Sequence, residues 1–132
     1  MWQSYLVGWF TFLILDTLWI RLLVSRFYLE HVPNILSLES GHIKANVLPA
    51  IIFYHIYYHC VFYLAVYKAS SLKESLTTAA ILGLMSYGTY VFTNHAIMKQ
   101  WSWLISLSDL TWGIILTAAI AFSAYRVKTG YN

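Results

Sequence analysis

Four long apolar stretches constrain the fold of this 132-residue chain more than any other feature. They cover about residues 4–24, 47–67, 76–98 and 102–125. Each approaches the roughly 20 apolar residues that a helix needs to cross a bilayer. Of all residues, 60% are hydrophobic and 10% are charged, whereas soluble domains carry about 25% charged residues. The sequence therefore predicts an all-α integral membrane protein, built as an antiparallel four-helix transmembrane bundle.

Residues 1–132 are expected to form a single transmembrane domain, because the chain is short and contains no evident linker. The longest connection, residues 25–46, mixes apolar and polar side chains around Pro33. It is expected either to lie along the membrane interface or to form an ordinary solvated loop. The third and fourth stretches are joined so closely that their helices should be antiparallel neighbours.

The basic residues do not decide the orientation of the chain. We call side A the membrane face that carries both termini and the connection at residues 68–75, and side B the opposite face. Four of the eight Lys and Arg residues fall on each side, so the rule that they gather in the cytoplasm gives a tie. A tie indicates either dual topology or a weak orientation signal.

Asp16 and Asp109 lie inside the first and last apolar stretches. An aspartate at the centre of a membrane helix costs about 3 kcal/mol on insertion, and each Leu, Ile, Phe or Val offsets roughly 0.3–0.6 kcal/mol. The helices should still insert, with the carboxylates facing protein or water. Hydrogen bonds between membrane helices average only about 0.6 kcal/mol, so structural pairing is a weak reason for two aspartates. We therefore favour a functional polar cavity.

The polar residues of the four stretches fall in the side B half of the membrane, given a rise of about 1.5 Å per residue. Asp16 and Trp19 are three residues apart, and Asp109 and Trp112 repeat this D-x-x-W spacing. An indole can cover an aspartate from lipid and donate one hydrogen bond to it. We expect a substrate or ion cavity lined by Asp16, Trp19, His55, Thr89, Tyr90, Thr93, Asn94, Asp109 and Trp112.

His55 and His59 form an H-x-x-x-H pair on one helix face. Two imidazoles at this spacing can bind a metal when carboxylates complete the site. The surrounding aromatic residues indicate a packing face equally well, so we predict no metal site and keep both histidines as weak candidates. Tyr87 is assigned to packing, and Gly83 and Gly88 to close helix contacts. The sequence identifies no cofactor.

Three segments carry a family resemblance: "LDTLW", "GLMSYGTYVFTNHAIMKQW" and "SDLTWG". They resemble a family of small predicted bacterial membrane proteins of unknown function, with the patterns LDxxW, GLxxYGTYxxTN and DxxWG. The resemblance covers nearly the whole chain and includes both aspartates of the proposed cavity. The YGTY block of that family is often followed by an aspartate, where this chain has Val91. The resemblance implies a multi-pass protein of the bacterial inner membrane and supplies no activity.

The first functional hypothesis is transport or channelling of a small solute or ion, in which Asp16 and Asp109 take up and release protons or cations. A homodimer would help to enclose a path. One alternative is a membrane-embedded enzyme, or a subunit of one, that modifies lipids with an aspartate as general acid or base. The other is a non-catalytic partner that holds another membrane protein. The expected partners are thus the bilayer and a small solute, ion or lipid; without a basic stripe, nucleic acid is not expected.

Overall fold

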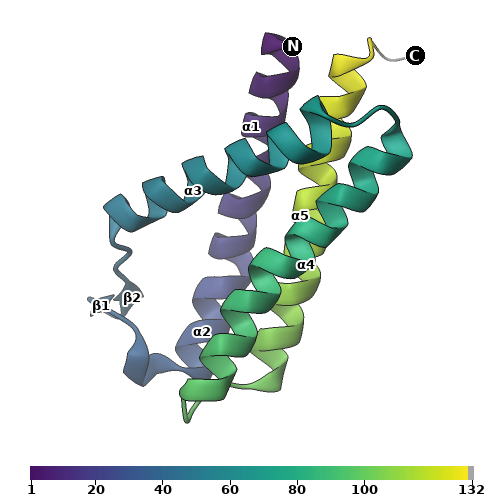
Figure 1. Cartoon of the computed structure of the whole chain (residues 1–132). Coiled ribbons are helices and arrows are strands. Elements are labelled where there is room, and N and C mark those ends of the chain that lie inside the picture. Colours follow the sequence, from purple (N-terminus) through teal and green to yellow (C-terminus); the bar gives the residue numbers. More distant parts are fainter. Residues whose placement is uncertain (131–132) are drawn as a thin grey trace.

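The computed structural model describes residues 1–130, and these are predominantly helical. Four long helical segments follow one another along the chain (Figure 1). They are α1 (Trp2–Trp19) continued by the π-helical turn η1 (Ile20–Val24) and α2 (Ser25–His31); α3 (Val47–Val61) continued by the π-helical η3 (Phe62–Tyr67); α4 (Leu72–Ile97); and α5 (Trp103–Lys128). The predicted all-α class is confirmed.

The first helix is longer than the apolar stretch that predicted it. It continues through η1 and α2 to His31, so the first seven residues of the expected loop 25–46 are helical. The rest of this connection contains the 3-10 turn η2 (Pro33–Ile35) and a short hairpin of β1 (Leu38–Glu39) and β2 (His42–Ile43). Ser40 and Gly41 form its turn with φ of 52° and 78°, a conformation that favours glycine.

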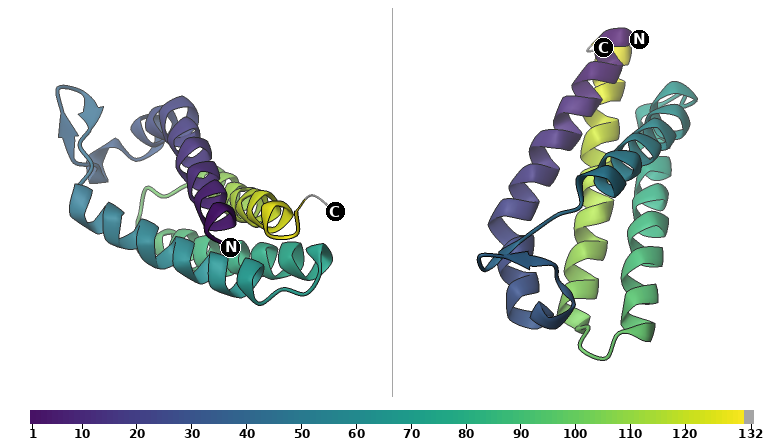
Figure 2. Two further views of the ribbon diagram at one scale, coloured as in Figure 1. Left: turned by 90° about the horizontal axis from the view of Figure 1, so that it is seen from above. Right: turned by 90° about the vertical axis from the view of Figure 1, so that its left-hand side faces the viewer.

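Helices α1, α4 and α5 lie side by side, and α5 runs antiparallel to the other two (Figures 1 and 2). The start of α1 and the end of α5 therefore lie at the same end of the bundle. Helix α3 departs from a regular four-helix arrangement, because it leans across the bundle and its N-terminal end stands apart (Figure 1). Only the later part of α3 and η3 buries side chains, beginning at Tyr57.

Three helices of the described chain are long and apolar enough to cross a membrane: Trp2–His31, Val47–Tyr67 and Trp103–Lys128. Helix α4 has 26 residues and is therefore about 39 Å long, which is sufficient length for a span. Its hydroxyl, amide and charged side chains make it less apolar than the others. A membrane crossing by α4 accordingly stays a prediction.

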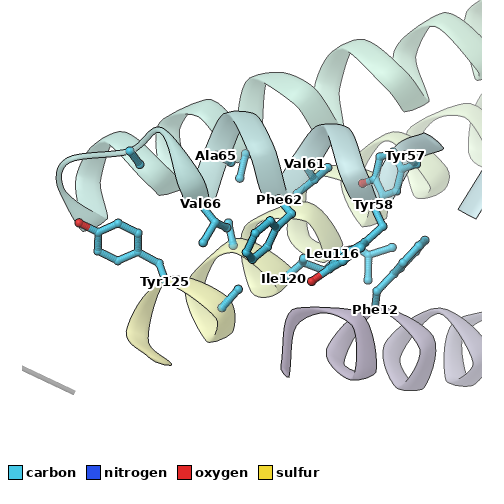
Figure 3. Packing of buried hydrophobic residues seen from close by; sticks show 14 residues of the cluster. Phe12, Tyr57, Tyr58, Val61, Phe62, Ala65, Val66, Leu116, Ile120 and Tyr125 are labelled. Atoms are coloured by element: carbon cyan, nitrogen blue, oxygen red, sulfur yellow. The ribbon is translucent and has the colours of Figure 1, made fainter. Parts of the chain in front are cut away.

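The larger of two buried apolar clusters lies in the side A half of the molecule (Figure 3). Phe12 from α1 and Tyr58 from α3 pack against Leu116 and Ile120 of α5, and all four side chains are fully buried. Helices α1 and α5 approach closely at Ala124, where the Ser4 hydroxyl donates a hydrogen bond to the Ala124 backbone carbonyl at 2.5 Å. A smaller cluster, made of Tyr28, Val32, Trp101 and Ile105, lies at the side B end.

Helices α4 and α5 meet through glycine. A Cβ atom on Gly83 would lie 2.5 Å from the Gly113 carbonyl oxygen and 2.7 Å from the Thr117 hydroxyl. The Tyr87 ring covers Gly113 and would overlap any side chain there. Gly88 is different, because its nearest neighbour would be the Leu110 side chain at 3.5 Å, an ordinary contact. Close packing was predicted at Gly83 and Gly88, and the structure brings α5 that close only at Gly83.

Side chains complete the helix ends on side A. Ser71 caps α4 by accepting a hydrogen bond from the Glu74 backbone N–H at 3.1 Å, and the Glu74 carboxylate accepts from both the N–H and the hydroxyl of Ser70. At the end of η3, the Lys128 ammonium donates to three backbone carbonyls, those of Val66, Tyr67 and Ala69, at 2.7–2.9 Å. These contacts satisfy groups that a helix terminus leaves without partners.

Candidate intramembrane binding site

A cavity of about 440 Å³ lies in the side B half, and all four helical segments contribute to its wall. Five of its twelve lining residues belong to the set expected from the sequence: Asp16, Trp19, Tyr90, Asp109 and Trp112. No Lys, Arg or His lines the cavity in the described chain. The site is thus formed by two acidic groups and a mainly aromatic wall.

Asp16 lies near the end of α1, where its side chain points inward and is 7% exposed. The Tyr54 hydroxyl of α3 donates a hydrogen bond to its carboxylate. A buried carboxylate needs such donors, because leaving it unpaired away from water is costly. The tilt of α3 brings Tyr54 to this position, so the hydrogen bond to Asp16 depends on that tilt.

Asp109 lies on α5 and is 8% exposed. Its carboxylate accepts a hydrogen bond from the Tyr28 hydroxyl at 2.5 Å. The Tyr28 oxygen lies 3.2 Å from the Tyr90 hydroxyl, which can donate because the Tyr28 proton is directed to Asp109. Tyr90 is 48% exposed. Two hydroxyl groups therefore lead from the buried acid to Tyr90 of α4, whose side chain is half-exposed.

The D-x-x-W repeat forms one reciprocal contact between the antiparallel helices α1 and α5. The Trp19 and Trp112 rings stack with their centroids 4.5 Å apart and their planes 3° from parallel. Trp112 lies close to the carboxylate of Asp16, and Trp19 close to that of Asp109. Each indole therefore accompanies the acid of the opposite helix. The Trp112 Nε1 is buried and makes no hydrogen bond of good geometry among the described residues, and the acceptor that lies beside it is the Asp16 carboxylate.

The π-helical turn η1 sets the direction of Tyr28. In an unbroken α-helix, each residue turns by about 100°, so Tyr28 would point about 120° away from Asp16. The π-helical turn adds one residue and reduces this difference to about 20°. The Ser25 hydroxyl bonds the Ile20 carbonyl, five residues earlier, at 2.9 Å. The local change in helix type thus turns the phenol of α2 into the same cavity as the acid of α1.

The remaining residues expected at the site lie outside the cavity. Thr89 and Thr93 share a face, as predicted, but it is the exposed face of α4; the Thr89 hydroxyl bonds the Met85 carbonyl at 2.7 Å. Asn94 is half-buried and does not line the cavity. Helix α4 instead contributes Ser86, Tyr87 and Tyr90. The structure thus brings five of the nine expected residues to the cavity and places Thr89, Thr93, Asn94 and His55 outside it.

His55 and His59 lie on the exposed side of α3. The Nδ1 atom of each imidazole bonds the carbonyl four residues earlier, at 2.9 Å and 2.6 Å respectively. His59 Nε2 lies 3.0 Å from the Tyr5 hydroxyl, so both of its nitrogens have protein partners. The described residues contain no group of three His, Cys, Asp or Glu side chains that could hold a metal ion. These histidines would have favoured the lipid-enzyme alternative, whose general acid or base is an aspartate, and neither of them lines the cavity.

Sequence reasoning missed four hydroxyl-bearing residues of the cavity wall: Tyr28, Tyr54, Ser86 and Tyr87. Tyr28 was assigned to a loop, and Tyr54 to an aromatic packing face. Tyr87 was assigned to packing, although it belongs to the YGTY block that the family resemblance had already singled out. That block was the available signal, since it also contains Tyr90.

The fold and the site define a class: an all-α membrane protein with two buried acids at one cavity that has a mainly aromatic wall. The chain belongs to the family described as "Predicted membrane protein (DUF2177)", whose family model matches residues 1–126. The resemblance drawn from the three motifs is thereby confirmed. No curated protein and no solved structure matches the chain.

Proposed function

We propose that this protein moves a cation across the membrane, with Asp16 and Asp109 as the groups that bind it and exchange it for protons. One observation carries the proposal: two buried carboxylates, from the first and last helices, line one cavity that contains no basic side chain in the described chain. Ionisable residues inside a membrane usually mark ion or proton pathways. Two acids without a counter-ion favour a cationic or protonated occupant.

In this mechanism each acid alternates between a protonated state and a state paired with the cation. The Tyr54 hydroxyl donates to Asp16 and the Tyr28 hydroxyl to Asp109, so each acid keeps a donor when it is ionised. The hydrogen-bonded chain from Tyr90 through Tyr28 to Asp109 gives protons a path to the buried acid within the cavity. We further propose a multi-pass location in the bacterial inner membrane, with a homodimer enclosing the path.

The test is cation–proton exchange in proteoliposomes that contain a pH-sensitive dye. Sodium, potassium, ammonium and quaternary ammonium ions are added outside in turn, and internal pH is recorded. We expect at least one cation to release internal protons with wild type, and both Asp16→Asn and Asp109→Asn to abolish the release. Asparagine has nearly the shape of aspartate, and a melting curve of each variant checks its folding.

Glu30→Gln is the matched control. It also removes one acid, but Glu30 lies on the exposed face of α2. Its carboxylate forms an ion pair with Arg26 one helical turn earlier, and 62% of its side chain is accessible. This variant should exchange cations as wild type does. If wild type releases no protons with any member of the panel, or if both asparagine variants exchange normally, the proposal is wrong.

A further inference from the structure

The cavity wall has more aromatic rings and fewer oxygen ligands than a binding site for an inorganic cation usually has. Seven of its twelve residues are aromatic, and they come from all four helical segments. Inorganic ions are usually held by several carboxylate, carbonyl or water oxygens, and the cavity offers two carboxylates among the rings. Aromatic faces attract cations through their negative quadrupole and are used to recognise quaternary ammonium groups. The chemistry of this wall therefore suits a cation that also has an apolar body.

The size of the cavity also suits an organic cation better than an inorganic one. A volume of about 440 Å³ corresponds to roughly fifteen water molecules at about 30 Å³ each. A dehydrated metal ion would leave most of this space empty or filled with water, against a mainly apolar wall. The volume falls within the range of about 300–1,000 Å³ that is typical of small-molecule sites. A ring-bearing amine would fill it much better.

The rim of the cavity is apolar and open to the outer surface. Phe53 of α3 and Tyr90 of α4 both line the cavity, and they are 46% and 48% exposed. Helix α3 stands apart from the bundle at this end (Figure 1). In the proposed four-span topology, these two half-exposed rings face the hydrocarbon of the bilayer. A rim of this kind fits a ligand that is soluble in the membrane through its apolar part.

We propose that the cavity binds a small monovalent organic cation with an apolar, ring-bearing body, which it takes up from the bilayer; this rests on the cation function proposed above. The charged group pairs with Asp109 or Asp16, and the second acid keeps its proton. The body lies against the outer face of the stacked pair Trp19 and Trp112.

The experiment is isothermal titration calorimetry of the purified full chain in detergent with benzyltrimethylammonium. Its neutral carbon isostere, neopentylbenzene, has the same shape without the charge, and tetramethylammonium has the charge without the ring. We expect saturable binding of the first compound and at least tenfold weaker binding of the other two. Equal binding of the isostere would show that charge is not recognised and would overturn the proposal.

Variants locate the bound cation. Asp109→Asn and Asp16→Asn should each weaken binding of benzyltrimethylammonium, and Trp19→Leu should weaken it by about 2- to 30-fold, the range expected for one cation–π contact. Glu30→Gln and Tyr63→Leu are controls that remove an acid and a half-exposed aromatic ring away from the cavity. Loss of binding in the controls as well would overturn the site assignment.

Binding and transport separate the two proposals. Saturable, charge-dependent binding by wild type without proton exchange in proteoliposomes would support the organic-cation site and refute transport. Proton exchange driven by sodium or potassium, together with no binding of benzyltrimethylammonium, would refute the organic-cation site and leave transport standing. Proton exchange driven by benzyltrimethylammonium, lost in Asp109→Asn, would support both.

Discussion

Replacing Gly83 by alanine tests the seam between α4 and α5. The new Cβ would lie 2.5 Å from the Gly113 carbonyl oxygen and 2.9 Å from its carbonyl carbon. Both are backbone atoms, so α5 must move as a whole to make room. Gly88→Ala is the matched control, because it makes the same change on the same helix and its Cβ meets Leu110 at an ordinary 3.5 Å.

The magnitude follows from two opposing effects. Alanine in a helix interior is more favourable than glycine by about 0.5–1 kcal/mol, and this applies to both positions. Forcing extra atoms into a close-packed contact costs about 1–3 kcal/mol, and this applies to Gly83 alone. Gly88→Ala should therefore be neutral or slightly stabilising, and Gly83→Ala should be less stable than Gly88→Ala by about 1–3 kcal/mol.

The assay is reversible unfolding in mixed micelles of mild detergent and dodecyl sulfate, followed by circular dichroism. The free energies of unfolding of both variants are compared with that of wild type. If Gly83→Ala is as stable as Gly88→Ala, the two helices do not approach as closely as the structure indicates, and the argument for the seam fails. A spread seam would also displace Tyr87 and Tyr90, so cation binding should weaken in Gly83→Ala and not in Gly88→Ala.

Three further predictions use the same unfolding assay. Tyr28→Phe should lower stability by about 1–3 kcal/mol, because the buried carboxylate on α5 loses its donor; an unchanged value would mean that another group replaces it. Lys128→Met should cost about 1.5–3 kcal/mol through three lost charged hydrogen bonds, whereas Arg126→Met, which removes a neighbouring charge, should cost less. Hydrogen bonds from Ser70 hold the pKa of Glu74 below its usual 4.5. The free energy of unfolding of wild type should therefore begin to fall when the pH drops below about 4.5, and the loss should be complete below the lowered pKa of the folded protein. Glu74→Gln should lack this loss, because it has no carboxylate at this position.

The sequence predicted the features that are set by the cost of exposing groups to lipid. Apolar length gave the helical class, and the cost of a carboxylate in hydrocarbon identified Asp16 and Asp109 as groups that must face protein or water. Both are buried at one cavity. These arguments succeed because they depend on the chain and the solvent alone, with no knowledge of how the helices pack.

The missed residues depend on helix rotation and tilt, which apolar patterns in a membrane helix do not encode. A helix that is apolar all round has no strong polar face, so nothing indicated that Thr89 would face outward and Ser86 inward. The direction of Tyr28 depends on one extra residue in η1, and that of Tyr54 on the lean of α3. A direct contact such as that between Gly83 and Gly113 also needs both helices to be placed first.

The pairing of the first helix with the last has a consequence for biogenesis. Trp112, which lies beside Asp16, is encoded 96 residues later, which takes on the order of 5–20 seconds to translate. During that interval α1 holds an acid whose neighbouring indole has not yet been made, at about 3 kcal/mol of insertion cost. The apolar residues of α1 offset that cost, so the helix can insert first, and its carboxylate is covered by α5 only when the last helix arrives.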